Sequence, residues 1–64
     1  MVNGTKIKQL MAKKGMTNRE MAKSVGVSES MVSFITSDLR EPTVAVLVRI
    51  AAKLGCTVDE LIKH

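Results

Sequence analysis

The segment NREMAKSVGVSESMVSFITS, residues 18–37, contains two short helical patterns separated by a glycine. Within each pattern the apolar residues recur three or four positions apart, which places them on one face of a helix. Gly26 lies between the patterns, where a residue in the left-handed conformation would end the first helix. The segment therefore predicts two short helices joined by a tight turn. Their inward-facing residues are Met21, Ala22, Val25, Val32 and Ile35.

Capping residues mark the starts of both helices. Thr17 and Glu20 form a capping box, in which the hydroxyl accepts from the third backbone N–H and the carboxylate accepts from the N–H of the cap. The next helix follows Ser28, a favourable N-cap, and has Glu29 in its first turn, where the helix dipole favours an anion. These signals place the first helix from Asn18 and the second directly after Ser28.

Two longer helical patterns flank this pair. The N-terminal one covers residues 5–14 and ends at Gly15. The C-terminal one follows a proline-containing connector, begins after Thr43 and runs to Leu54. Their inward-facing residues are Ile7, Leu10 and Met11 in the first, and Leu47, Ile50, Ala51 and Leu54 in the second.

A second threonine–glutamate pair lies near the end of the chain. Thr57 and Glu60 repeat the capping box and predict a fifth helix that brings Leu61 and Ile62 onto the core. The chain contains no linker, repeat or low-complexity stretch. We therefore expect an all-α fold, a compact five-helix bundle in which residues 1–64 form a single domain.

The composition favours a binding protein with a polyanionic partner. The 64 residues include ten Lys and Arg against six Asp and Glu, which gives a net charge of +4 and a pI near 9.7.

The single Cys56 has no partner for an internal disulfide, and no leader opens the chain, so we expect a cytoplasmic protein. The longest apolar run, residues 44–48, is too short to span a membrane.

The sequence offers little support for catalysis. Cys56 has no neighbouring histidine to form a thiolate, and the only histidine, His64, is the last residue. One cysteine and one histidine do not form a metal site of known spacing, and no glycine-rich phosphate loop occurs. We therefore expect no enzyme activity, no metal, no cofactor and no small-molecule ligand.

Two helices joined within three or four residues through a glycine form a helix-turn-helix, the unit that presents a helix to the major groove of DNA. Over nearly its whole length the chain resembles the Cro/C1-type, or Xre-like, helix-turn-helix family of phage and bacterial transcriptional regulators. The resemblance rests on IKQL at 7–10, GMT at 15–17, EMA at 20–22, VGVS at 25–28, residues 42–47, IA at 50–51, LG at 54–55 and VDELI at 58–62.

The resemblance implies a five-helix bundle of the phage-repressor type that binds double-stranded DNA. Its third helix enters the major groove, usually in a dimer that sets two such helices about 34 Å apart. The base-reading residues would be Ser28, Glu29, Ser30, Ser33 and Phe34. Phosphate contacts would come from the start of the second helix and from the connector after the third. For these contacts we select Thr17, Asn18, Arg19, Lys23 and Arg40.

The chain departs from the family pattern in two places. No Arg, Lys, Asn or Gln lies between Ser28 and Ser37, so the bidentate contacts to guanine or adenine are absent from the third helix. Glu29 can instead accept from a cytosine amino group, and Phe34 can press on a thymine methyl.

The second departure concerns an ion pair. Many family members pair an Arg in the first helix with a Glu late in the third. Met11 and Thr36 occupy these positions here, and we interpret the change as packing in place of an ion pair.

Taken with the resemblance, these observations favour a bacterial or phage-encoded repressor that occupies an operator as a homodimer, formed through its fourth and fifth helices. Three alternatives stay open. The serines of the third helix can be caps or solvated positions, and Phe34 can contact protein instead of DNA. A protein-interaction module on the same fold, such as an antitoxin, would use the apolar surface of the third helix. A non-specific nucleoid or RNA binder would not distinguish between unrelated sequences.

Overall fold

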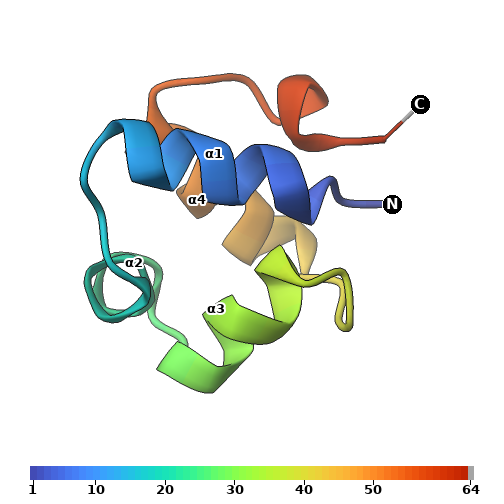
Figure 1. Ribbon diagram of the computed structural model, residues 1–64. Coiled ribbons are helices and arrows are strands. Elements are labelled where there is room, and N and C mark those ends of the chain that lie inside the picture. Colours follow the sequence, from blue (N-terminus) through green and yellow to red (C-terminus); the bar gives the residue numbers. More distant parts are fainter. Residues whose placement is uncertain (64) are drawn as a thin grey trace.

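The computed structural model describes residues 1–63, which form four α-helices and one turn of 3₁₀-helix (Figure 1). The second and third helices pack against each other below the first helix in this view. The elements are α1 (Gly4–Lys13), α2 (Asn18–Val25), α3 (Glu29–Thr36), α4 (Val44–Leu54) and the 3₁₀ turn η1 (Asp59–Leu61). The all-α class is therefore confirmed for the described residues.

Short polar side chains cap all four α-helices. The hydroxyls of Thr17, Ser28 and Thr43 accept from backbone N–H groups 3.1 to 3.2 Å away, as the sequence predicts. The cap of α1 is Asn3, whose Oδ1 accepts from the N–H of Lys6 at 3.1 Å. Because this cap precedes the predicted start, α1 begins one residue earlier than expected.

The core is entirely aliphatic and is drawn from every helix. Its buried members are Val2, Ile7, Met11, Met21, Ala22, Val25, Val32, Ile35, Leu47, Ile50, Ala51, Leu54 and Leu61. Two of the predicted core residues, Leu10 and Ile62, are only half-buried. Val2 was not predicted to be buried, yet only 2% of its surface is exposed.

The predicted fifth helix is wrong, because the chain makes only the 3₁₀ turn η1 there. The predicted capping contacts do form: the N–H of Thr57 donates to Glu60 and the N–H of Glu60 donates to Thr57, both at 3.3 Å. Ile62 then adopts extended angles, with φ −102° and ψ 138°, and forms an antiparallel bridge with Val2. Pairing with the N-terminal segment therefore replaces further helix.

The two ends of the described chain lie side by side, as Figure 1 shows. The N–H of Asn3 donates to the carbonyl oxygen of Leu61 at 2.7 Å, and the N–H of Lys63 donates to that of Met1 at 2.8 Å. These bonds and the bridge between Val2 and Ile62 hold Val2 against the C-terminal segment, which explains its burial. The N-terminal residues are thus part of the folded core.

Met11 and Thr36 occupy the two positions where the family resemblance implies an ion pair. Met11 is 4% exposed and packs in the core. The hydroxyl of half-buried Thr36 donates to the carbonyl oxygen of Ser33 at 3.1 Å, within its own helix. Neither side chain carries a charge, and α1 and α3 are in contact. The arrangement fits our interpretation that packing replaces the ion pair.

Candidate nucleic-acid interface

The turn between α2 and α3 depends on Gly26. Its φ of 76° and ψ of 34° lie in the left-handed region, where a side chain is unfavourable. The N–H groups of Gly26 and Val27 both donate to the carbonyl oxygen of Ala22, at 2.9 and 3.1 Å. This pattern ends α2 and lets Ser28 begin α3 after a connection of only three residues, 26–28.

Arg49 of α4 supports the same turn, a contact that we did not predict. Its Nη1 donates to the carbonyl oxygen of Val25 at 3.4 Å, at the C-terminal end of α2. A cation there also compensates the negative end of the helix dipole. No local pattern in the sequence indicates this role, because Arg49 lies 24 residues from its acceptor.

The predicted base-reading residues all lie on the exposed side of α3 or at its start. Val32 and Ile35 are 2% and 1% exposed and fix the opposite side of the helix to the core. The exposed side therefore offers hydroxyl groups, one carboxylate and one aromatic ring. These groups belong to Ser28, Glu29, Ser30, Ser33 and Phe34.

Two of the predicted contact residues already have partners. The Ser28 hydroxyl accepts from the N–H of Met31 and keeps its own hydrogen available to donate. The Thr17 hydroxyl both accepts from the N–H of Glu20 and donates to the Glu20 carboxylate, each at 3.1 Å. Hydrogen bonds from the backbone and hydroxyl of Thr17 lower the pKa of Glu20. In this structure, Thr17 has no spare hydroxyl donor for a phosphate, although its neighbour Asn18 is exposed.

The structure brings Arg40 to the end of α3. Its guanidinium carbon lies 5.6 Å from the centre of the Phe34 ring, within the range of a cation–π contact. The N–H groups of Leu39 and Arg40 both donate to the carbonyl oxygen of Phe34, at 2.8 and 3.3 Å, so the connector folds back onto α3. Phe34 is 39% exposed, which fits the outward orientation that its spacing predicts. A base-reading candidate and a phosphate-contact candidate therefore lie together.

The other cationic candidates lie on α2. Arg19 is in its first turn and Lys23 in its last, and both are exposed. Because α2 packs against α3, these charges lie on a helix that neighbours α3, whose own exposed side carries no cation. The predicted cationic contacts therefore lie on elements next to α3 and not on α3 itself.

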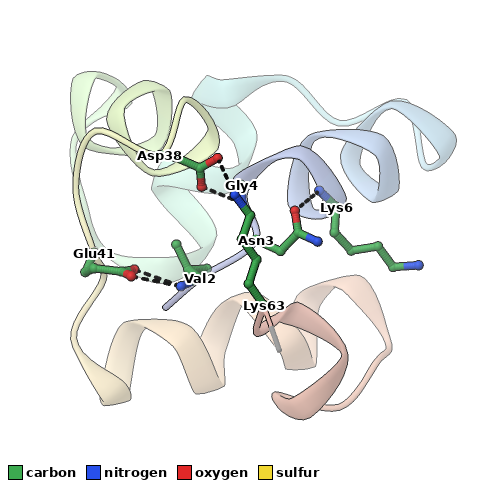
Figure 2. A network of polar contacts seen from close by, with 7 residues as sticks. All are labelled: Val2, Asn3, Gly4, Lys6, Asp38, Glu41 and Lys63. Carbon is green, nitrogen blue, oxygen red and sulfur yellow. Dashed lines mark hydrogen bonds and ion pairs between the residues drawn. The ribbon is translucent and has the colours of Figure 1, made fainter.

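A cluster of polar contacts joins the connector after α3 to both ends of the described chain (Figure 2). Asp38 accepts from the N–H of Gly4 at 2.9 Å and from the ammonium of Lys63 at 3.3 Å. Both carboxylate oxygens of Glu41 accept from the N–H of Val2, at 2.9 and 3.0 Å. The hydrogen bond from Gly4 and the charge of Lys63 lower the pKa of Asp38. We call this cluster the terminal clasp; the sequence did not reveal it.

The described residues contain neither a metal site nor a membrane-spanning helix. No group of three or more His, Cys, Asp or Glu side chains within residues 1–63 could hold a metal ion. In the same part of the chain, every helix is too short or too polar to cross a membrane. Cys56 is half-buried, and this burial raises the pKa of its thiol. His64 lies outside the described residues.

Comparison with known proteins gives the same fold and motif. A family model described as helix-turn-helix matches residues 7–61. An uncharacterised HTH-type transcriptional regulator from Archaeoglobus fulgidus is 32% identical over 57 residues, which cover 89% of this chain and 81% of the relative. The chain belongs to the helix-turn-helix family of transcriptional regulators. The predicted family is thereby confirmed.

Two solved structures of repressor type resemble this helix-turn-helix protein closely. The P22 c2 repressor, solved with a synthetic operator, superposes with a TM-score of 0.92 at 27% identity, over 98% of this chain and 96% of the repressor chain. SinR, the biofilm regulator of Bacillus subtilis, was solved with DNA; it superposes with a TM-score of 0.83 at 33% identity, over 92% and 98% of the two chains. These relatives are regulators of Cro/C1 type, and the family consists of DNA-binding regulators and not enzymes.

Proposed function

We propose that this protein is a sequence-specific double-stranded DNA-binding regulator that represses transcription by occupying an operator. The observation that carries the proposal is the packed α2–turn–α3 unit, whose outer helix exposes polar side chains while its apolar side is buried. Membership of the helix-turn-helix family supports it, as do the DNA complexes of the P22 c2 repressor and SinR. In a bacterial or phage-infected cell such a regulator acts in the cytoplasm. Residues 1–64 act as one DNA-binding domain.

In this proposal α3 reads base edges and its neighbours bind phosphates. Glu29 accepts from cytosine amino groups, the serine hydroxyls bond to base edges or phosphates, and Phe34 contacts a thymine methyl. Asn18 and the first N–H groups of α2 donate to a phosphate, since the N-terminus of a helix favours an anion. Arg19, Lys23 and Arg40 supply charge. Thr17 contributes once Glu20 releases its hydroxyl.

The distribution of exposed apolar residues supports a homodimer as the binding species. Leu39 is 71% exposed, and Val44 and Val48 of α4 are 78% and 49% exposed. Val44 and Val48 are four residues apart and share one side of α4. In η1, by contrast, Leu61 is fully buried. We therefore assign the dimer contact to the connector and α4, with η1 contributing less than the sequence suggested.

The competing function, a protein-interaction module that uses an apolar α3, is less well supported. The exposed residues of α3 are mainly serines and a glutamate, and the one ring has Arg40 above it. The most exposed large apolar side chains lie elsewhere: Met1, Leu39 and Val44 are each more than 70% exposed. An apolar partner would therefore find little surface on α3.

Selection from random duplexes tests the proposal. Protein is bound to a random duplex pool at low salt, the bound fraction is amplified and sequenced over several rounds, and the enriched duplexes are assayed by gel shift. We expect a palindromic consensus whose two halves are about 34 Å apart, centre to centre. A pool that stays random would indicate a non-specific binder. No binding at micromolar protein would favour the interaction module.

A further inference from the structure

The connector after α3 has an unusual charge pattern for a segment that faces a polyanion. Arg40, a proposed phosphate contact, lies within two residues of two acids, in the sequence Asp38-Leu39-Arg40-Glu41. Carboxylates without other partners, so near Arg40 in the sequence, would repel a phosphate and would compete with it for the guanidinium. The function of Arg40 therefore depends on where the two carboxylates are held.

Both carboxylates have partners in the terminal clasp, and neither forms an ion pair with Arg40 in this structure. Glu41 binds the N–H of Val2 through both oxygens, and Asp38 binds the N–H of Gly4 and the ammonium of Lys63 (Figure 2). Gly4 is the first residue of α1, where the positive end of the helix dipole stabilises an anion. The two negative charges therefore point into the clasp.

The backbone of Asp38 determines the course of the connector. It is the only residue other than glycine with a positive φ among residues 1–63, at 60°. Its N–H donates to the carbonyl oxygen of Ile35 at 3.2 Å, so it ends α3 in the left-handed conformation that aspartate tolerates. The chain then reverses, and Arg40 comes to lie above Phe34. The left-handed conformation of Asp38 therefore sets the direction of the chain that leads to Arg40.

We propose that Asp38 and Glu41 are positioning residues for DNA binding: by holding the backbone of residues 2–4, they fix the connector so that Arg40 alone is presented to a phosphate. The inference rests on the proposed function, because it takes Arg40 as a phosphate contact. It adds a role for two acidic residues that would be expected to oppose DNA binding. The clasp thereby links the backbone of the N-terminal segment to the placement of Arg40.

Paired substitutions separate hydrogen bonding from charge. Glu41→Ala and Glu41→Gln both raise the net charge from +4 to +5, but only glutamine keeps an oxygen that can accept from Val2. Asp38→Ala and Asp38→Asn form a second pair, in which asparagine tolerates the left-handed conformation and alanine does not. Arg40→Gln measures the phosphate contact itself. Glu60→Gln is the charge control, since glutamine also serves in a capping box.

The measurement is the dissociation constant for a selected duplex, determined at several salt concentrations and at a temperature where circular dichroism shows each variant folded. We expect Arg40→Gln and both alanine variants to bind on the order of tenfold more weakly. Their salt slope, the slope of log binding constant against log salt concentration, should be smaller by about one. The amide variants should stay close to the wild type. Glu60→Gln should bind as tightly as the wild type or slightly more tightly. If Asp38→Ala fails to fold, the exposed Glu41 carries the test alone.

Three results would overturn the inference, and they can be told apart. Alanine and amide variants that bind equally tightly, while Arg40→Gln loses affinity, would show that Arg40 contacts phosphate without help from the clasp. An Arg40→Gln variant with the affinity and salt slope of the wild type would instead refute the phosphate contact, and the positioning role with it. A purely structural clasp would lower the melting temperature of the alanine variants but leave their salt slopes unchanged.

Discussion

Gly4 lies so close to the end of α3 that a Cβ atom there would be 2.5 Å from the carbonyl oxygen of Ile35 and 2.7 Å from that of Thr36. Real Cβ atoms essentially never approach backbone oxygens so closely. The absence of a side chain is therefore what lets α1 pack so closely against the end of α3. The same close approach brings the N–H of Gly4 within 2.9 Å of Asp38.

Gly4→Ala tests this contact. In an open helix, replacing glycine by alanine stabilises by up to about 1 kcal/mol. Here we expect a loss of about 1 to 3 kcal/mol in the free energy of unfolding, because α1 and α3 must move apart. Urea denaturation followed by circular dichroism measures this free energy. Thr5→Ala, at the exposed neighbouring position, is the control. We expect it to alter the free energy of unfolding by no more than about 0.5 kcal/mol. A stabilised Gly4→Ala variant would contradict the packing.

Asp38 also makes the stability depend on pH. Its pKa lies below the ordinary value of 3.8, chiefly because it accepts from Gly4. A carboxyl with a lowered pKa stabilises the fold above its ordinary pKa, and this contribution is lost as the pH falls through the lowered value. We expect the melting temperature to fall as the pH drops below about 4 and Asp38→Asn to reduce that dependence. Thermal melts at a series of pH values test this; equal slopes for the two proteins would contradict it.

Our proposal assigns base reading to α3 and phosphate binding to its neighbouring elements. The exposed side of α3 carries no cation, whereas α2 carries Arg19 and Lys23 and the connector carries Arg40. Phosphate neutralisation provides much of the affinity of a DNA-binding protein and does not depend on sequence. The three cations should therefore set affinity, while the side chains of α3 set specificity.

Single charge removals test this division. Arg19→Gln, Lys23→Gln and Arg40→Gln should each weaken binding to all duplexes and reduce the salt slope by about one. Ser33→Ala or Phe34→Ala should instead reduce the difference in affinity between the selected duplex and unrelated duplexes. Lys13→Gln, at the end of α1 that lies far from α3 in Figure 1, is the matched control. Gel shifts across a range of salt concentrations give these quantities, and unchanged salt slopes would remove the substituted cations from the interface.

Most of the helices could be predicted from local signals in the sequence. Caps such as Thr17 and Ser28, the stop at Gly26 and the apolar spacing are local signals, and the structure contains them all. The prediction of a fifth helix was wrong because Ile62 pairs with a distant partner, Val2, in extended conformation. The exposure of the α3 residues followed from their spacing. The terminal clasp and the contact from Arg49 did not, because they join residues 24 to 39 positions apart. The DNA roles of individual residues stay predictions.

For the whole molecule, the distribution of exposed apolar surface bears on assembly. Leu39, Val44 and Val48 are exposed on the connector and α4, although large apolar side chains usually gain stability from burial. A two-fold dimer would bury the same surface on both copies. It would also present two α3 helices to one face of a duplex, which a single copy cannot do.

Neutral substitutions test the dimer without changing the charge. We expect Leu39→Ser and Val44→Ser to leave the fold intact, because both side chains are exposed, but to shift the protein toward monomer and weaken binding to a palindromic duplex by about tenfold or more. Sedimentation velocity and gel shifts measure the two effects. Ala12→Ser, at an exposed position of α1, is the control. A wild-type protein that stays monomeric both free and on its selected duplex would refute the dimer.

Amide chemical-shift mapping shows whether the α2–turn–α3 face binds duplex DNA. Uniformly ¹⁵N-labelled protein is titrated with a selected duplex and with an unrelated duplex of equal length. We expect the largest shifts with the selected duplex at the start of α2, along residues 28–34 and at Arg40, and smaller shifts at α3 with the unrelated duplex. Shifts concentrated on α1 and η1, with α3 unchanged, would contradict this expectation.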